Sequence, residues 1–226
     1  MRRILAILPC AMLAACVARA PAPAVPAALQ APPEFPLDVY RDAQARGQEV
    51  LQVDTRHSHV AIEVRRGGPL AGLGHDHVVA SRNVQGYVLP GTGRADLFIP
   101  LAQLTVDEAG LREESGMGKP PSADAVEGTR RNMLDKVLEA ERFPFALVHI
   151  VRRDKDPLHV SITLHGRTQE FSSPAHIEQA AGKMTVSGEL TIAQSDFGIA
   201  PFAVLGGALQ VQDTLTLRYR IVAAQP

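Results

Sequence analysis

Several residue types are scarce in this 226-residue chain, and each scarcity excludes a class of protein. Trp is absent, and the aromatic residues are limited to seven Phe and three Tyr, so an aromatic platform for stacking nucleic-acid bases is not expected. Two Cys cannot build a disulfide framework or a four-cysteine zinc site. Neither sign of charge dominates, because 23 Lys and Arg face 24 Asp and Glu. We therefore expect no nucleic acid among the partners.

The remaining composition is that of an ordinary globular protein. The chain is 46% hydrophobic and 21% charged, which is too apolar for a disordered chain. Its length suits one domain with appendages and is sufficient to bury a substantial core.

The N-terminus is typical of a bacterial lipoprotein. Arg2-Arg3 precedes an apolar run over 4–13 that is too short to cross a bilayer as a helix. Leu13-Ala14-Ala15-Cys16 looks like a lipobox, the signal for cleavage before a lipid-modified Cys. We therefore predict a signal peptide over 1–15 and a membrane anchor on Cys16. The alternative is an ordinary secretion signal that is cut elsewhere.

Residues 16–48 are expected to join this anchor to the folded domain. Six Pro among many Ala over 17–36 favour an extended, polyproline-like linker without a core. Residues 38–48 are polar and predict a short helical or irregular lead-in. In bacterial lipoproteins, an Asp directly after the lipid-modified Cys is associated with retention in the inner membrane. This chain has Val17 at that position. By resemblance to such lipoproteins we expect the outer membrane, with the domain in the periplasm.

From about Glu49 the sequence predicts an antiparallel β-domain over 49–226. Apolar and polar residues alternate in four segments, which gives each strand one apolar and one polar face. A parallel sheet covered on both faces would show continuous apolar runs instead. The apolar positions are Val60, Ile62 and Val64, then Val160, Ile162 and Leu164, then Met184, Val186 and Leu190, and finally Leu215, Leu217, Tyr219 and Ile221.

Four weaker strand candidates, over 83–89, 94–101, 145–153 and 169–177, bring the total to about eight. Short strands separated by Gly, Pro, Asn and Asp are typical of a barrel or a sandwich. One helix is predicted over 122–140, where apolar residues follow helical spacing before Pro144. The preceding residues, 107–121, predict a long loop.

The histidines are the first candidates for chemistry. His57 and His59 are two positions apart, as are His75 and His77, so each pair projects from one face of a strand. Together with Asp76 they offer ligands for a metal ion or for a polar head group, since imidazole suits zinc and copper. However, His57 and His59 lie on the polar side of their alternation. Surface histidines are the simpler interpretation, and no metal or other cofactor is predicted.

Catalysis is a second hypothesis. Ser58 beside His57, or Ser195-Asp196 with a distant His, offers groups for a hydrolytic triad. However, the sequence has no Gly-x-Ser-x-Gly elbow, no H-E-x-x-H helix and no phosphate-binding glycine loop before a helix. We therefore predict a protein that is not an enzyme. A hydrolase stays as one alternative, and a metal- or haem-associated redox or stress accessory that uses His75 and His77 is the other.

The apolar faces of the strands are the remaining candidate. In a closed eight-stranded barrel the inner face either packs with side chains or leaves room for one ligand. The inner candidates here are mostly Val, Ile and Leu, with few aromatic residues to fill the space. A lipid-sized cavity therefore suits the sequence, but alternation does not distinguish a filled barrel from a hollow one.

A series of motifs runs from Val53 to the C-terminus. It comprises Val53-Asp54, His57-Ser58, Arg131-Asn132-Met133-Leu134, Phe143-Pro144, Leu164-x-Gly166, Ser195-Asp196-Phe197-Gly198-Ile199, Gly206-Gly207-Ala208 and Val211-x-Asp213. With these motifs the chain resembles the YceI-like family of bacterial lipid- and polyisoprenoid-binding proteins. The Ser-Asp-Phe-Gly-Ile stretch and its downstream Asp213 are the most specific part.

The resemblance implies an all-β, eight-stranded antiparallel, lipocalin-like barrel with a helix capping one end. It also implies non-catalytic binding or transport of an elongated apolar lipid, an isoprenoid or a fatty-acyl chain, held by burial of its methylenes in a dry channel. The thirteen alternating apolar residues named above are the expected lipid-binding residues.

One hairpin departs from the usual family pattern. Typical members have an aromatic-rich first hairpin, whereas this chain has Leu73-Gly74-His75-Asp76-His77. Two interpretations stay open for this segment. It forms either a polar mouth where imidazoles bind a ligand head group, or a tight loop in which Asp76 fixes the imidazoles. The sequence does not indicate the oligomeric state.

Overall fold

The computed structural model describes residues 30–153, 157–180 and 182–225. Ala31–Pro226 form one compact unit. The predicted signal peptide, Cys16 and residues 17–29 of the predicted linker lie outside the described residues. Within these residues, no helix has both the length and the apolar character needed to cross a bilayer.

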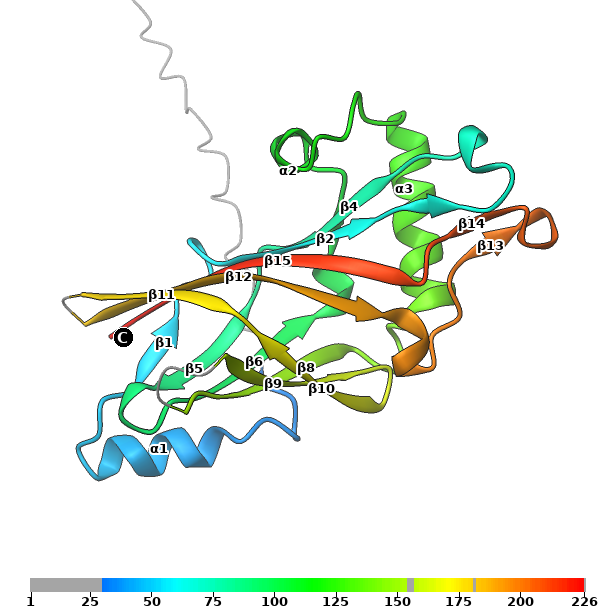
Figure 1. Cartoon of the computed structure of the whole chain (residues 1–226). Helices are drawn as coiled ribbons and strands as arrows, with labels where there is room; N and C mark the ends of the chain where they lie inside the picture. The colour runs from blue at the N-terminus through cyan, green and yellow to red at the C-terminus, as the bar shows by residue number, and fades with distance from the viewer. Residues whose placement is uncertain (1–29, 154–156, 181, 226) are drawn as a thin grey trace, which may run out of the picture. The chain divides into compact units, whose positions relative to one another are not determined.

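Strands dominate the domain, and few helices accompany them (Figure 1). In chain order, the helices and strands are α1 (Leu37–Ala45), β1 (Leu51–Val53), β2 (His59–Val64), β3 (Arg66–Gly67), β4 (His77–Ser81), β5 (Gln85–Leu89), β6 (Arg94–Pro100), β7 (Thr105–Val106), α2 (Ala109–Glu114), α3 (Ala123–Asn132), β8 (Phe145–Val151), β9 (Leu158–Leu164), β10 (Arg167–Ser173), β11 (Ala175–Ala180), β12 (Lys183–Ala193), β13 (Ala203–Val204), β14 (Leu209–Val211) and β15 (Thr214–Ala224). Short helical turns lie at Ala71–Leu73 (η1), Pro90–Thr92 (η2), Leu101–Gln103 (η3), Met133–Val137 (η4), Gln194–Phe197 (η5) and Leu205–Gly207 (η6).

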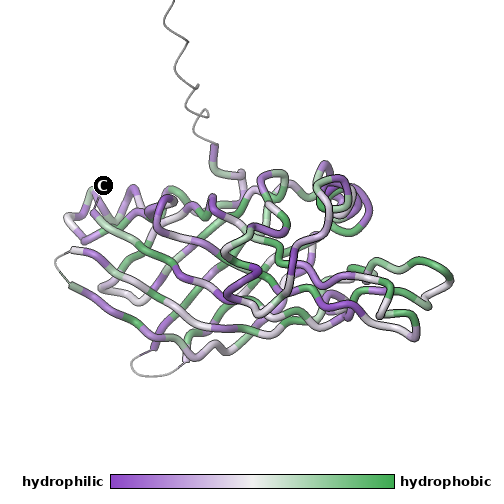
Figure 2. Tube along the Cα trace, turned by 90° about the horizontal axis from the view of Figure 1, so that it is seen from above, coloured by the Kyte–Doolittle hydropathy of each residue, from purple (hydrophilic) through white to green (hydrophobic). Residues whose placement is uncertain are grey.

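Antiparallel pairing joins twelve strands in one curved sheet. The order of neighbours is β10-β9-β8-β6-β5-β1-β15-β2-β4-β7, and β12 joins this path by pairing with both β15 and β11. Seen from above, hydrophobic and hydrophilic positions alternate along the crossing strands (Figure 2). A second sheet of β13, β14 and β3 extends from one end of the first. The prediction of an antiparallel, mostly β domain is therefore confirmed.

The predicted closed, eight-stranded barrel is wrong in both closure and strand number. β15 pairs with β12 along one edge and with β2 and then β1 along the other, so the sheet branches at β15. Pro174, which has no N–H to donate, separates β10 from β11 inside the predicted strand 169–177. β10 then reaches β12 through a side chain, because the Ser173 hydroxyl donates to the Glu189 carbonyl at 3.4 Å.

Several strands were missed because they are too short to show alternation. β1 and β14 have three residues each, and β3, β7 and β13 have two. A period of two needs at least four residues to become visible.

The predicted loop over 107–121 contains α2. Leu111 and Met117 from this segment pack on Ala61, Val78 and Ala80. The outer face of β2, which the alternation predicted to be exposed to solvent, is therefore covered here, together with that of β4, a strand that was not predicted. The two apolar residues are too few to give a helical pattern in the sequence.

α3 lies within the predicted helix 122–140. Ser122 is its N-cap, and the Ser122 side-chain oxygen accepts a hydrogen bond from the Ala125 backbone N–H at 3.3 Å. After Asn132 the helix continues as the wider turn η4.

α1 lies within the predicted linker but packs on the sheet. Its residues Tyr40 and Ala43 are buried against Leu89. The Tyr40 hydroxyl donates to Asp96 Oδ2 at 2.6 Å, and Arg94 Nε donates to the same oxygen at 2.7 Å. Burial opposes the ionisation of Asp96, but hydrogen bonds from Arg94 and Tyr40, with His149, outweigh it and lower the Asp96 pKa. Residues 31–48 of the predicted linker therefore belong to the compact unit.

We expect Tyr40→Phe to lower the free energy of unfolding by about 1–3 kcal/mol, because the buried Asp96 carboxylate loses a donor. Urea denaturation followed by circular dichroism measures the change. Tyr87→Phe is the matched control. The Tyr87 ring lies 5.3 Å from that of Tyr40, but its hydroxyl has no hydrogen bond among the described residues. Equal losses for both variants would contradict the role given to Asp96.

Candidate functional site

An apolar cavity of about 590 Å³ lies inside the curve of the sheet. Its wall comes from strands on both sides of β15, from β5, β6, β8 and β9 opposite, and from α3 and η4. The structure places all thirteen of the predicted lipid-binding residues on this wall. Their contact with a ligand stays a prediction.

The inward side chains show that the domain is hollow. Leu215, Leu217 and Tyr219 on β15 face the cavity and are only partly buried, as are Val186 and Leu190 on β12. Side chains in a filled core would be fully buried instead. The volume lies within the roughly 300–1,000 Å³ of small-molecule sites.

Part of the cavity wall was not predicted. The missed residues include Leu97 and Ile99 on β6, Val148 and Ile150 on β8, and Met133, Val137 and Leu138 after α3. The alternation is hidden in β6 because its outer face also carries an apolar residue, Phe98, which Phe35 covers with the two rings 5.0 Å apart. The signal that identifies the β8 residues is cross-strand register, since Ile150 pairs with Val160 and Val148 with Ile162.

The structure separates the predicted histidines. His75 and His77 line one end of the cavity, with ring centroids 6.4 Å apart. His57 is exposed, and its Nδ1 lies 2.7 Å from Asp54 Oδ2. His59 is not on the cavity wall, and its burial, together with the charge of Arg82, lowers its pKa.

The two histidine pairs therefore do not converge on one metal. The described ranges contain no group of three or more His, Cys, Asp and Glu that could hold a metal ion. The metal hypothesis gains no support from this geometry.

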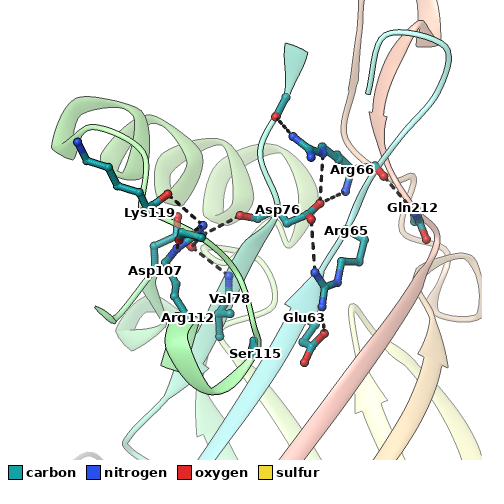
Figure 3. A network of polar contacts seen from close by, with 12 residues as sticks. Glu63, Arg65, Arg66, Asp76, Val78, Asp107, Arg112, Ser115, Lys119 and Gln212 are labelled. Atoms are coloured by element: carbon teal, nitrogen blue, oxygen red, sulfur yellow. Dashed lines mark hydrogen bonds and ion pairs between the residues drawn. The ribbon is translucent and has the colours of Figure 1, made fainter. Parts of the chain in front are cut away.

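Asp76 does not fix the imidazoles, so that interpretation of the hairpin is wrong (Figure 3). Asp76 Oδ1 accepts the Arg66 backbone N–H at 2.9 Å, and Oδ2 accepts from Arg65 Nη1 at 3.4 Å. The Asp76 carbonyl accepts from Arg112 Nη1 at 2.8 Å. Arg65 also donates to Glu63 at 2.5 Å. Asp76 therefore closes the turn and binds arginines.

Asp107 holds His77 in place of Asp76. The Asp107 carboxylate is fully buried, with Oδ2 2.7 Å from His77 Nδ1. Its Oδ1 accepts from Arg112 Nη1 at 2.6 Å and from the Val78 backbone N–H at 3.1 Å (Figure 3). Because Nδ1 of His77 is occupied, Nε2 is the ring nitrogen left for the cavity.

The Asp107 pKa lies below its ordinary value. Burial alone would raise it, but hydrogen bonds from His77, Arg112 and the Val78 backbone N–H outweigh burial. The ionised carboxylate is therefore the form that the fold stabilises.

The two serines of the hydrolase hypothesis have structural roles. The buried Ser58 hydroxyl donates to the Val222 carbonyl at 3.2 Å and accepts the Val222 N–H at 2.9 Å. The Ser195 hydroxyl donates to Asp213 Oδ2 at 2.5 Å, and its backbone N–H donates to Oδ1 at 2.8 Å. Neither serine is hydrogen-bonded to a histidine in the described part of the chain.

The fold and site define an antiparallel β-protein built around an apolar cavity. The model of the YceI-like domain matches residues 51–223, and the chain therefore belongs to the YceI-like family. No curated protein matches the chain.

Two solved structures share the fold. One is a polyisoprenoid binding domain from Saccharophagus degradans implicated in plant cell wall breakdown, at 13% identity and a TM-score of 0.57, covering 79% of this chain and 99% of that chain. The other is BcnA from Burkholderia cenocepacia, at 18% identity and a TM-score of 0.54, covering 76% and 99%. Nearly the whole length of each solved chain is therefore matched by this one.

We expect Asp107→Asn to lower the free energy of unfolding at pH 7 by about 3–5 kcal/mol, since it leaves the buried Arg112 without its counter-ion. The pKa of Asp107 is lower in the folded protein than its ordinary value of 3.8, so the ionised carboxylate stabilises the fold above pH 3.8. This stabilisation is lost as the pH falls through the pKa of the folded state. The wild type should therefore lose stability below about pH 4, and the variant should lose less over that range. Chemical denaturation from pH 7 to pH 3 measures both effects.

Asp38→Asn is the control for this change. Asp38 forms a surface pair with Arg41, in which both side chains are more than half exposed, and such pairs contribute little. A parallel pH dependence in the wild type and Asp107→Asn would contradict the role of Asp107.

Proposed function

We propose that this domain binds or transports an elongated apolar lipid, an isoprenoid or a fatty-acyl chain, without changing it chemically. The observation that carries the proposal is the hollow cavity, whose wall is formed largely by Val, Ile and Leu from the strands. Burial of a lipid chain contributes about 25 cal/mol per Å² of apolar surface, before the cost of ordering the ligand. The Saccharophagus degradans domain of the same fold, described as polyisoprenoid-binding, supports this ligand class.

For the ligand head group, we propose the end of the cavity that holds Arg66, His75 and His77. His77 is oriented by the buried Asp107, at 2.7 Å, so its free ring nitrogen is preorganised for a polar group. At the other end, the Arg94 guanidinium is already bound by Asp96 at 2.7 Å.

We also propose that the mature chain is a lipoprotein of the bacterial cell envelope, cleaved before Cys16. Support comes from the lipobox-like Leu13-Ala14-Ala15-Cys16 and from the Pro-rich residues that follow. The absence of Asp after Cys16 favours the outer membrane, with the domain in the periplasm.

A pair of neighbouring substitutions on β12 tests the ligand site. Leu190 faces the cavity, whereas Thr191 is exposed on the other face. We expect residues 31–226, purified without detergent, to carry a stoichiometric long-chain lipid in native mass spectrometry and after solvent extraction. Leu190→Trp places an indole in the space that the lipid would fill, and overpacking against the bound chain by about 1–3 kcal/mol corresponds to roughly 5- to 150-fold weaker lipid binding.

Thr191→Trp is the matched control, because it adds the same indole outside the cavity. Equal lipid content in both variants would contradict the cavity as the binding site. Metal analysis of the same samples tests the redox alternative. A stoichiometric transition metal that is lost on changing both His75 and His77 to Ala, in a domain without lipid, would overturn the proposal.

A further inference from the structure

The exposed hydrophobic side chains gather at one end of the domain. Among the described residues, the large hydrophobic side chains that are exposed are Leu70 (39%), Leu73 (71%), Val204 (40%) and Leu205 (69%). They lie on two loops, the connection from β3 to β4 and the β13–β14 hairpin, which project together beyond the main sheet (Figures 1 and 2). We call residues 67–74 and 199–212 the apolar tip.

The apolar tip carries no charge. None of its 22 residues is Asp, Glu, Lys or Arg, although 21% of the whole chain is charged. Two neighbouring arginines, Arg65 and Arg66, are held by Glu63 and Asp76. The Lys136 ammonium lies 6.0 Å from the centroid of the Phe202 ring in the tip. Exposed apolar surface of this kind marks an interaction site.

Backbone hydrogen bonds join the two loops of the tip, so the loops form one ordered unit. β3 pairs with β14, with Gly67 opposite Gln210. The Leu70 backbone N–H donates to the Ala208 carbonyl at 2.8 Å. Gly68 allows this close approach, since a Cβ there would lie 2.6 Å from the Ala208 oxygen.

Leu205 is held in a backbone conformation that disfavours leucine. Its φ is +52°, in the left-handed region where bulky residues are rare. Its side chain is 69% exposed, so packing within the domain does not account for the strain. Strain retained at an exposed apolar residue points to a role for that side chain in binding.

The tip is also the mouth of the cavity. Leu73 and Val204 are exposed to solvent and at the same time line the cavity, as does Leu209 between the loops. Apolar surface therefore runs from the outside of the tip into the proposed lipid site.

We propose, building on the lipid-binding function above, that the apolar tip docks on the surface of a lipid bilayer. Docking brings the mouth of the cavity to the acyl chains, so that a lipid chain passes between bilayer and cavity without crossing water. A protein partner fits less well, because stable protein interfaces use roughly 20–30 residues a side, far more than four exposed side chains on two loops.

Binding of residues 31–226 to phosphatidylcholine vesicles tests this proposal. This part of the chain lacks Cys16, so any binding comes from the domain itself. We expect co-sedimentation with the vesicles that changes little between low and high salt, because the tip is uncharged. The double variant Leu70→Gln with Leu205→Asn should bind at least about tenfold more weakly, since two apolar side chains no longer enter the bilayer.

The matched control is Leu70→Met with Leu205→Met, which keeps both side chains apolar and should bind like the wild type. Asn tolerates the left-handed region better than Leu, so the polar variant should unfold at a temperature no lower than the Met control. Neither Leu70 nor Leu205 lines the cavity. Oleic acid added from ethanol should therefore load equally into all three proteins, as measured by native mass spectrometry.

The outcomes separate docking from ligand binding. Unchanged vesicle binding in the polar variant would overturn the docking proposal. A second result would also overturn it. If sedimentation velocity without vesicles shows a dimer for the wild type and a monomer for the polar variant, the tip joins two copies of the chain instead. Vesicle binding that depends on the tip in a domain that never takes up oleic acid or native lipid would support docking and reject the cavity function.

Discussion

The shape of this domain depends on β15, the strand at which the sheet branches. One edge of its eleven residues pairs with β12, and the other pairs with β2 and β1. This register turns Leu215, Leu217 and Tyr219 toward the cavity. A slip of one residue would turn polar neighbours inward, so the cavity wall and the strand pairing are set by the same interaction.

Two buried carboxylates hold the outer layer in place. Asp96 binds Tyr40 of α1, together with Arg94 and His149. Asp107 binds Arg112 of α2, together with His77. Each carboxylate therefore accepts from an arginine and faces a histidine Nδ1, and each fixes a helix against the outside of the sheet. Both carboxylates lie outside the cavity wall, whereas the wall is largely apolar between the arginines and histidines at its ends. This arrangement keeps an apolar space inside a stable fold.

Sequence alone predicted the long strands and the apolar wall, because β2, β9, β12 and β15 each have enough residues for their alternation to be visible. It did not predict the branch at β15, since pairing partners far apart in the chain leave no local signal. Alternation also could not show that the interior is hollow, because volume depends on the distance between facing strands. The role of Asp107 was also not predicted, because Asp107 lies thirty positions from His77 in the chain and this contact leaves no local signal. The exposure of the uncharged segment 199–212 was not predicted either, because it depends on how the β13–β14 hairpin projects from the sheet.

The most direct test of the central claim, that this hollow holds a lipid chain, is a high-resolution crystal structure of residues 31–226 purified from cells without added lipid or detergent. We expect continuous, elongated electron density along Leu190, Leu215 and Leu217, in van der Waals contact with the wall. A cavity closed by repacked side chains, or one filled with hydrogen-bonded water, would contradict it.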